Sequence, residues 1–415
     1  MIILKEKQMN YVIIGNSAAA IGCVSGIRTI DKASSITLIS DESHFTYSRP
    51  LISYWLKGKV TDDKMYYRNS DFYEKNNCTT ILGKRVEKID AATKKLVLDD
   101  GNTVEYDKLM VATGSSPFVP PVEGLDKAQN SFTFMTWDSV KAVKEAVKKD
   151  SKVVIMGAGL IGLKAAEGLH EICEDITVVD LADRILPSIL DKKGADFVQK
   201  HIEKAGIKFV LNDAASSVKG NIISLKSGQE LTYDILIVAV GVRPNTGLVK
   251  DAGGSVNRGI VTDNKQATTI DGVYSAGDCT ECLDICTGQN KILALLPNAY
   301  MQGEIAGINM AGGDKTFDTA MPMNAIGFFG LHMITAGAME GECVELIDEN
   351  NYRKMFFSDG LFKGYILIGE ISRAGIYTSL IREKTPMGEI DSNLLKVSPQ
   401  LLVYNKKARQ TKMSS

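Results

Sequence analysis

Two stretches of the sequence share one pattern, and this repetition constrains the fold more than any other feature. Residues 11–14 and 153–156 are short apolar runs rich in β-branched residues, and each leads directly into a turn of small residues and a helical pattern. A second apolar run follows each helix and ends in an acid, Asp41 in the first copy and Asp180 in the second. A strand, a tight turn, a helix and a second strand make a βαβ unit, so the sequence predicts two dinucleotide-binding units.

The two turns differ in how well they match the expected glycine pattern. Residues 157–162 read GAGLIG and fit the pattern G-x-G-x-x-G. The first glycine permits the tight turn, the second lets the backbone approach a pyrophosphate, and the third lets helix and strand pack closely. Residues 15–20 read GNSAAA, with Ser17 and Ala20 at the later glycine positions. Both turns are predicted to bind a dinucleotide, although an ordinary strand-to-helix turn would also explain the first.

Three further stretches read as buried strands that end at a glycine, as a chain does where it passes close to a flat ligand. They cover residues 108–114, 235–245 and 272–278. Beyond Gly312 the pattern changes to short alternating strands, which indicates a smaller C-terminal domain. The 415 residues are enough for about three domains. The predicted fold class is α/β, with two Rossmann-like domains and a small C-terminal α/β domain.

The composition excludes several functional classes. Lys and Arg number 48 against 50 Asp and Glu, so the formal net charge of -2 gives no reason to expect nucleic acid or an anionic membrane as a partner. No apolar run approaches the roughly 18 residues of a membrane span. The start of the chain has no signal-peptide pattern and the seven cysteines are scattered, so we expect a protein of the reducing cytoplasm.

Taken together, these motifs resemble the two-dinucleotide-binding-domain flavoproteins, the glutathione-reductase-like family, over residues 9–310. In that family the first unit binds FAD and the second binds the nicotinamide cofactor. The resemblance implies these FAD-binding residues: Gly15, Ser17, Ala18, Asp41, Glu42 (as the alternative ribose acid), Arg49, Pro50, Val86 (through its backbone, at the adenine), Thr113, Gly114, Gly277, Asp278 and Pro297. It implies these NAD-binding residues: Gly157, Gly159, Leu160, Ile161, Gly162, Asp180 and Gly241.

The resemblance also implies the domain boundaries. The FAD-binding domain would comprise residues 1–114 and 243–311, with the NAD-binding domain, residues 115–242, inserted in it. Residues 312–397 would form the small C-terminal domain, and residues 398–415 a polar, basic tail.

The loop after the first unit indicates the branch of the family. Disulfide reductases of the family need a redox-active cysteine beside the flavin, but residues 45–53 read FTYSRPLIS and contain none. This stretch resembles the Tyr-x-Arg-Pro loop of ferredoxin and rubredoxin reductases and of the flavoprotein part of NADH-dependent nitrite reductase. With GNSAAAIG and GAGLIGLKAAEGL, it is most similar to the NAD-linked flavoproteins that accompany carbon monoxide dehydrogenase.

Two departures from the family pattern concern the chemistry. Oxygenase-type ferredoxin reductases carry a Lys where this chain has Ser53 and a Glu where it has Lys164, and there the two pair beside the flavin. In this chain the positive charge is therefore at position 164, and position 53 carries no charge. We predict Lys164 and Arg49 as catalytic residues, while an ordinary surface lysine is the alternative explanation for Lys164.

A cluster of cysteines follows directly on Asp278, at positions 279, 282 and 286. Such spacing can ligate zinc or an iron–sulfur cluster, but only three thiols are present and no fourth ligand follows nearby. We therefore expect no metal site, and interpret these cysteines as small apolar residues. A thiol–flavin redox role stays open as an alternative.

The resemblance implies an FAD-dependent NAD(H) oxidoreductase in which hydride moves between nicotinamide and flavin. The expected partner is a small iron–sulfur protein, ferredoxin- or rubredoxin-like, within a carbon monoxide dehydrogenase system. One alternative is an NADH oxidase, or a reductase of quinones or dyes, that works without a redox cysteine. A second is an NADH-sensing flavoprotein that does not turn over. A homodimer is one option for the oligomeric state.

Overall fold

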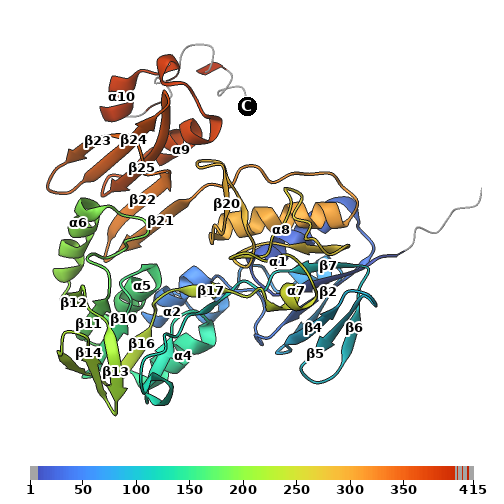
Figure 1. Ribbon diagram of the computed structural model, residues 1–415, viewed down its shortest axis with the longest axis horizontal. Coiled ribbons are helices and arrows are strands. Elements are labelled where there is room, and N and C mark those ends of the chain that lie inside the picture. The colour runs from blue at the N-terminus through green and yellow to red at the C-terminus, as the bar shows by residue number, and fades with distance from the viewer. Residues whose placement is uncertain (1–7, 398–399, 401–403, 405–408, 411–415) are drawn as a thin grey trace, which may run out of the picture. The chain divides into compact units, whose positions relative to one another are not determined.

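The computed structural model describes residues 8–397, 400, 404, 409 and 410. The chain divides into two compact units, each made of several segments (Figure 1). The first unit comprises Met1–Arg49, Thr61–Ser116 and Val242–Ala320, and the second comprises Pro50–Val60, Pro117–Gly241 and Met321–Ser415. Apart from these few positions, the predicted basic tail, residues 398–415, lies outside the described residues.

A five-stranded parallel sheet forms the centre of the first unit. In spatial order its strands are β18 (Val273–Ser275), β7 (Lys108–Val111), β1 (Asn10–Ile14), β2 (Ser35–Ser40) and β3 (Cys78–Leu82). Nearly all residues of β1 and β7 are buried, as in parallel sheets that are covered on both faces. The first predicted βαβ unit is thus confirmed as β1, the following helix and β2.

One face of this sheet is covered by two closely packed helices, α1 (Ala18–Ile30) and α8 (Leu296–Met310) (Figure 1). Glycines line their contact: a Cβ added at Gly303 would lie 1.9 Å from the backbone oxygen of Ala19. The backbones of the two helices therefore approach each other more closely than a methyl group allows.

Gly303→Ala should therefore destabilise the protein by about 1–3 kcal/mol, because the new methyl group meets backbone that cannot move aside without shifting a helix. Gly375→Ala is the matched control, since Gly375 is also helical and a Cβ there would meet nothing within 4 Å. That variant should be neutral or up to about 1 kcal/mol more stable. Urea unfolding of both variants checks the prediction, and equal midpoints would contradict it.

The other face of the first sheet carries a small antiparallel sheet. It consists of β4 (Val86–Asp90), β5 (Lys95–Leu98) and β6 (Thr103–Glu105). Its apolar side chains share one core cluster with Val12 and Ile14 of β1. The first unit also contains α3 (Phe72–Lys75), α7 (Gly247–Asp251), β19 (Cys282–Asp284) and β20 (Gln289–Lys291).

The second unit contains another five-stranded parallel sheet. In spatial order its strands are β12 (Lys208–Leu211), β11 (Asp175–Asp180), β10 (Lys152–Met156), β16 (Ile235–Val238) and β9 (Ser131–Thr133). Helix α5 (Leu160–Leu169) joins β10 to β11 and confirms the second predicted βαβ unit. An antiparallel sheet adjoins it, made of β13 (Ala215–Lys219), β14 (Ile222–Leu225) and β15 (Glu230–Thr232).

The segment Pro50–Val60 packs against helices of the second unit. Helix α2 (Ile52–Leu56) lies in this segment, and a Cβ added at Gly168 of α5 would lie 3.2 Å from the backbone oxygen of Ser53. Helix α4 (Trp137–Ala146) packs on the same segment. The ring centroid of Trp137 is 6.1 Å from that of Trp55. The second unit also contains helix α6 (Lys192–Glu203).

The C-terminal part of the second unit is a five-stranded antiparallel sheet with helices α9 (Ala374–Glu383) and α10 (Ser392–Val397). In spatial order its strands are β21 (Met323–Phe328), β22 (Leu331–Gly337), β25 (Leu361–Ile368), β24 (Tyr352–Ser358) and β23 (Glu342–Ile347). The alternating pattern beyond Gly312 predicts strands at residues 344–347, 354–357 and 365–369, and these overlap β23, β24 and β25. Strands β21 and β22 were not predicted.

Among the described residues, no helix combines the length and the apolar character needed to cross a membrane.

Candidate functional site

The first glycine turn connects β1 to α1 and admits only glycine at its start. Gly15 has a φ of +110°, and a Cβ there would lie 2.1 Å from the backbone oxygen of Ala112. Ser17 occupies the N-cap of α1 without a side-chain capping hydrogen bond, and the first turn, which starts at Ala18, holds no acid. The N–H groups at this helix end are thus open to an anion such as a pyrophosphate.

A hydrogen-bonded cluster ties the loop after β2 to this turn. The side-chain oxygen of Asn16 accepts hydrogen bonds from the hydroxyls of Thr46 and Tyr73, the latter at 3.0 Å. The amide nitrogen of Asn16 donates to the backbone oxygen of His44 at 3.1 Å. Sequence reasoning missed this cluster, because His44, Thr46 and Tyr73 lie 28, 30 and 57 residues away from Asn16 in the sequence.

Two predicted ribose acids lie at the end of β2, in different surroundings. Glu42 accepts from the Tyr47 hydroxyl at 2.6 Å and is paired with Arg49. Asp41 is exposed, and its only described partner is Arg85, at 3.4 Å. Its carboxylate is therefore the more accessible of the two.

The register of the two sheets shows a further difference between the copies. Gly15 N donates to the backbone oxygen of Ile39, as Gly157 N donates to that of Val179, at 2.7 Å in both cases. Ser40 in the first unit is thus equivalent to Asp180 in the second, and Asp41 lies one residue further along. Asp41 as the ribose acid of the first unit stays a prediction.

Arg49 and Asp278 carry opposite charges inside the first unit. Burial acts to lower the pKa of Arg49, but Tyr47, Glu42 and Asp278 outweigh it, and the pKa is raised. Burial raises the pKa of Asp278, and the positive charge of Arg49 offsets this only in part. Asp278 is thus a partly buried carboxyl group suited to accept hydrogen bonds from ligand hydroxyls.

The other predicted FAD residues frame the same region of the first unit. A Cβ at Gly277 would lie 3.3 Å from that of Ala19 in α1, and Gly277 N donates to Gln302 at 2.7 Å. Pro297 lies in the first turn of α8 beside Asn298, whose buried amide nitrogen has no hydrogen-bond partner among the described residues. An orphaned buried donor, a partly buried carboxyl group and an uncapped helix end in the same unit fit a long, polar dinucleotide such as FAD.

Three further predicted FAD residues, Val86, Thr113 and Gly114, also belong to the first unit. Thr113 and Gly114 follow β7, and both bind Asn245, for example through the Thr113 hydroxyl and the Asn245 backbone oxygen at 2.7 Å. Val86 is buried at the start of β4, in the core cluster that contains Ile14. Pro50, in contrast, belongs to the second unit.

The second glycine turn, in the second unit, leaves space where a pyrophosphate would lie. A Cβ at Gly157 would lie 2.3 Å from the backbone oxygen of Ala239, and one at Gly162 would lie 1.9 Å from that of Gly157. A Cβ at Gly159, the N-cap of α5, would meet nothing within 4 Å. Leu160 and Ile161 form the first turn of α5, which holds no acid. This cradle fits the pyrophosphate of NAD.

Asp180 holds the same turn from the end of β11. Its carboxylate accepts from Ala158 N at 2.6 Å and from Ala182 N at 2.8 Å. Both oxygens keep further lone pairs for a ribose hydroxyl. The next arginine in the sequence, Arg184, is paired with Asp183 at 2.7 Å. Gly241 is the last of the predicted NAD-binding residues. It follows β16, and a Cβ added at Gly241 would meet nothing within 4 Å.

Lys164 belongs to a buried charge network, which we call the Glu167 network. Glu167 pairs with Lys164 at 2.7 Å and with Lys57 of the α2 segment at 3.0 Å. The exposed side-chain fractions are 9% for Glu167, 5% for Lys57 and 16% for Lys164. Burial acts to raise the pKa of Glu167, but its hydrogen bonds to the two lysines outweigh this and the pKa is lowered. Lys164 is thus not a free surface lysine.

The Glu167 network also reaches the C-terminal sheet. Lys164 donates to the backbone oxygen of Gly327, and the backbone N–H of Phe329 donates to Glu167 at 3.2 Å. The Lys164 ammonium lies 5.2 Å from the ring centroid of Phe328. Ser53 is buried, and its hydroxyl has no hydrogen-bond partner among the described residues. The network therefore joins α2, α5 and the β21–β22 turn.

The cysteines after Asp278 are buried or half-buried thiols with protein partners. Cys279 is fully buried and lies within hydrogen-bond distance of the backbone oxygens of Val111 and Ala276. Burial raises the pKa of Cys282 to about 11, which disfavours the reactive thiolate. Within the described part of the chain, no group of His, Cys, Asp and Glu is arranged to hold a metal ion.

Catalysis should accordingly need no thiol. A variant with all seven cysteines replaced by Ser or Ala, once folded and loaded with flavin, should retain most NADH-driven dye reduction. The single variant Cys279→Ala serves as the sharper test, and loss of dye reduction without loss of flavin would reverse this assignment.

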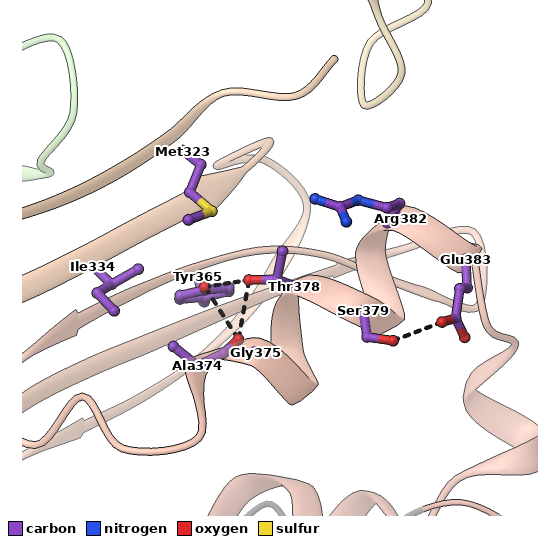
Figure 2. Close-up of a pocket in the computed structure, with 9 residues that line it drawn as sticks. All are labelled: Met323, Ile334, Tyr365, Ala374, Gly375, Thr378, Ser379, Arg382 and Glu383. Atoms are coloured by element: carbon purple, nitrogen blue, oxygen red, sulfur yellow. Dashed lines mark hydrogen bonds between the residues drawn. The ribbon is translucent and has the colours of Figure 1, made fainter. Parts of the chain in front are cut away.

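A cavity of about 350 Å³ lies in the C-terminal part, between the sheet and α9 (Figure 2). Met323, Ile334 and the ring of Tyr365 form its apolar side, whereas Arg382 lies at its exposed edge. The Tyr365 hydroxyl is bonded to that of Thr378 at 2.8 Å. None of the predicted site residues lines this cavity.

Comparison with known proteins agrees with this geometry. The family model "Pyridine nucleotide-disulphide oxidoreductase" matches residues 9–303, and "Rubredoxin NAD+ reductase C-terminal domain" matches residues 322–385. The NADH-dependent phenylglyoxylate dehydrogenase subunit epsilon of Aromatoleum evansii is 30% identical over 93% of this chain and 94% of its own length. The NADH oxidase of Methanocaldococcus jannaschii is 34% identical over 74% and 71%, respectively.

Solved structures agree as well. The NADH:rubredoxin oxidoreductase from Clostridium acetobutylicum superposes with a TM-score of 0.78 at 25% identity, covering 92% of this chain and 96% of that one. The chain spans only about half the length of two other relatives, both from Bacillus subtilis.

A chain with two Rossmann-like units, each with its own glycine turn, defines a flavoprotein oxidoreductase that uses a pyridine nucleotide. The chain belongs to the pyridine nucleotide-disulphide oxidoreductase family, whose members use FAD and NAD(H). The predictions of family, fold class and cofactors are confirmed.

Proposed function

We propose that this protein is an NADH-dependent flavoprotein that exchanges electrons between NAD(H) and a small iron–sulfur protein. The observation that carries the proposal is the presence of two separate dinucleotide cradles, one in each unit, together with a loop at residues 45–53 that lacks a cysteine. FAD, when bound, supplies a carrier that takes up two electrons together and releases them singly. Such a carrier suits a partner that accepts one electron at a time.

In this proposal the first unit holds FAD. The N-terminal N–H groups of α1, around Ser17 and Ala18, bind the pyrophosphate, and Asp41 accepts from the adenosine ribose. Asp278 would accept hydrogen bonds from the ribityl hydroxyls, and the positive charge of Arg49 offsets the negative charge of Asp278. The other predicted FAD residues supply backbone contacts and shape.

The second unit holds NAD(H) in the same proposal. Gly159, Leu160 and Ile161 present the N-terminus of α5 to the pyrophosphate, and Asp180 accepts from the ribose 2′-hydroxyl. Lys164 remains a candidate catalytic residue. Its ammonium has three donors and gives one to Glu167 and one to Gly327, which leaves one N–H for a bound substrate.

Turnover with a panel of acceptors tests the proposal. We expect NADH-dependent reduction of at least one rubredoxin or ferredoxin, and NAD⁺ reduction by the same carrier once it has been reduced. Because such carriers are usually acidic, both rates should fall with ionic strength. Failure to reduce every iron–sulfur protein tried, in a flavin-loaded enzyme that still reduces dyes, would contradict the proposed partner.

An NADH oxidase is the second candidate function. It is favoured by the relative from Methanocaldococcus jannaschii, which bears that name. Oxygen needs neither a docking surface nor a thiol, so this activity is compatible with the same two cradles. Oxygen consumption that accounts for all NADH oxidised, with no effect of an added iron–sulfur protein, would favour it.

The narrower parts of the proposal come from the sequence. The resemblance places the partner in a carbon monoxide dehydrogenase system, the scattered cysteines place the protein in the cytoplasm, and a homodimer is one option for the native protein. We likewise assign residues 115–242 as the NAD-binding domain inserted in the FAD-binding domain. Co-purification with the partner and the measured mass of the native protein test the first and third of these points.

A further inference from the structure

Arg68 lies in the first unit, just after the segment that pairs with the loop at residues 45–49. Its guanidinium carbon is 4.8 Å from the ring centroid of Tyr67, 5.8 Å from that of Phe72 and 5.7 Å from that of Tyr300 in α8. Three aromatic rings therefore hold this side chain in place through cation–π contacts.

Within the described part of the chain, no residue uses the N–H donors of this guanidinium. Arg68 makes no hydrogen bond and no ion pair with any residue that the structure describes. An arginine offers five N–H donors in a planar fork that matches a carboxylate. A fork that is already held in place loses little side-chain entropy when a carboxylate binds.

The rings around Arg68 continue to an exposed aromatic residue. Phe72 contacts Tyr73 with a centroid distance of 5.4 Å, and Tyr73 stacks on Phe45 at 4.8 Å. Phe45 is 40% exposed, so the row of rings reaches the surface. We call the residues Phe45, Tyr67, Arg68, Phe72, Tyr73 and Tyr300 the Arg68 patch.

The Arg68 patch is directly connected to the first glycine turn. Tyr73 donates to the side-chain oxygen of Asn16 at 3.0 Å and binds the backbone N–H of Thr46, the residue after Phe45, at the same distance. Asn16 follows Gly15 in the turn that we assign to FAD. A protein bound at the patch would therefore lie one hydrogen bond away from that cofactor site.

We propose that the Arg68 patch is the docking surface for the acidic iron–sulfur protein, with a partner carboxylate on the Arg68 guanidinium. This inference rests on the proposed function and names the surface that its partner uses. Aromatic residues and arginine are the residues most enriched at the energetic centres of protein interfaces. A small patch of this kind also suits the small, short-lived contacts of electron-transfer partners.

Two variants of Arg68 test the inference. Arg68→Gln removes the charge and keeps a polar stem, whereas Arg68→Lys keeps the charge and loses the planar fork. We expect the first to raise KM for a rubredoxin or a [2Fe–2S] ferredoxin roughly tenfold and to flatten the salt dependence of the rate, and the second to lie between it and the wild type. Reduction of ferricyanide by NADH should stay unchanged in both. Arg382→Gln, an exposed arginine of the second unit, is the matched control and should leave KM unchanged.

The outcomes separate this inference from the proposed function. If the wild type reduces an iron–sulfur protein but Arg68→Gln has the same KM and salt dependence, the docking surface is wrong and the proposed function stands. If the wild type reduces no iron–sulfur protein, both are overturned. Loss of FAD from Arg68→Gln would place Arg68 in the cofactor site and contradict docking there, as would an Arg68→Lys variant that binds the partner like the wild type.

Discussion

NADPH should be a poor substrate: we expect kcat/KM for NADH to exceed that for NADPH by roughly 100-fold, or about 2.7 kcal/mol. The reason is the carboxylate of Asp180, which can accept from the 2′-hydroxyl of NADH but repels the 2′-phosphate of NADPH. The hydrogen bonds from Ala158 and Ala182 hold this carboxylate in place, so it cannot turn away from the phosphate. Arg184 is engaged by Asp183 and does not compensate.

Asp180→Ser should reduce this preference to a few-fold, and it should also raise KM for NADH, because the carboxylate supports the glycine turn as well. Asp175→Ser is the matched control, since Asp175 begins the same strand and its ion pair with Lys208 is largely exposed. Asp175→Ser should leave kcat/KM for NADH and for NADPH unchanged. Equal use of NADH and NADPH by the wild type would contradict the assignment of Asp180.

Loss of Glu167 should have the largest effect on stability. Glu167→Ala leaves the ammonium groups of Lys57 and Lys164 buried without their counter-ion, and removal of one partner from a buried pair costs about 3–5 kcal/mol. Glu203→Ala is the matched control, because this glutamate is exposed at the end of α6 and hydrogen-bonds only Gln199 among the described residues. It should change the free energy of unfolding by less than about 0.5 kcal/mol.

The pH dependence of stability gives an independent check on Glu167. Its pKa is lower in the folded chain than in the unfolded chain. The stabilisation is therefore fully present above the unfolded pKa and is lost as the pH falls through the folded one. The difference in unfolding free energy between wild type and Glu167→Gln should shrink in acid. A constant difference from neutral pH to acid, or a Glu167→Ala protein as stable as Glu203→Ala, would show that the lysines do not depend on this carboxylate.

Local sequence patterns predicted the two glycine turns, because their chemistry is confined to a few consecutive residues. A tight turn needs a backbone with positive φ, and a pyrophosphate needs room beside a helix N-terminus, so Gly157 and Gly159 are readable directly from the chain. The same reasoning located Asp180 at the end of β11. It also placed Asp41 directly after a strand that ends at Ser40, as β2 does.

Contacts between distant segments could not be predicted in this way. Lys57 and Glu167 are separated by 110 positions, and the turn that receives Lys164 belongs to β21 and β22, which were not predicted. Strand β21 reads MNAIGF, in which Asn and Gly interrupt the apolar alternation. The sequence indicated that Lys164 departs from the family pattern, and Glu167, three residues on in the same helix, neutralises it. The packing of α2 against α5 adds Lys57, which the sequence did not indicate, as a second cation on this carboxylate.

The central claim is that this flavoprotein passes electrons to a small iron–sulfur protein, and one rapid-mixing measurement tests it most directly. The FAD-loaded protein is reduced with one equivalent of NADH in the absence of oxygen and is then mixed with oxidised rubredoxin, with oxidised [2Fe–2S] ferredoxin or with air-saturated buffer. We predict that at least one iron–sulfur protein reoxidises the flavin faster than oxygen does, with a rate that falls as salt is added. If oxygen or a small quinone reoxidises it orders of magnitude faster than every iron–sulfur protein tried, the claim is contradicted and the oxidase takes its place.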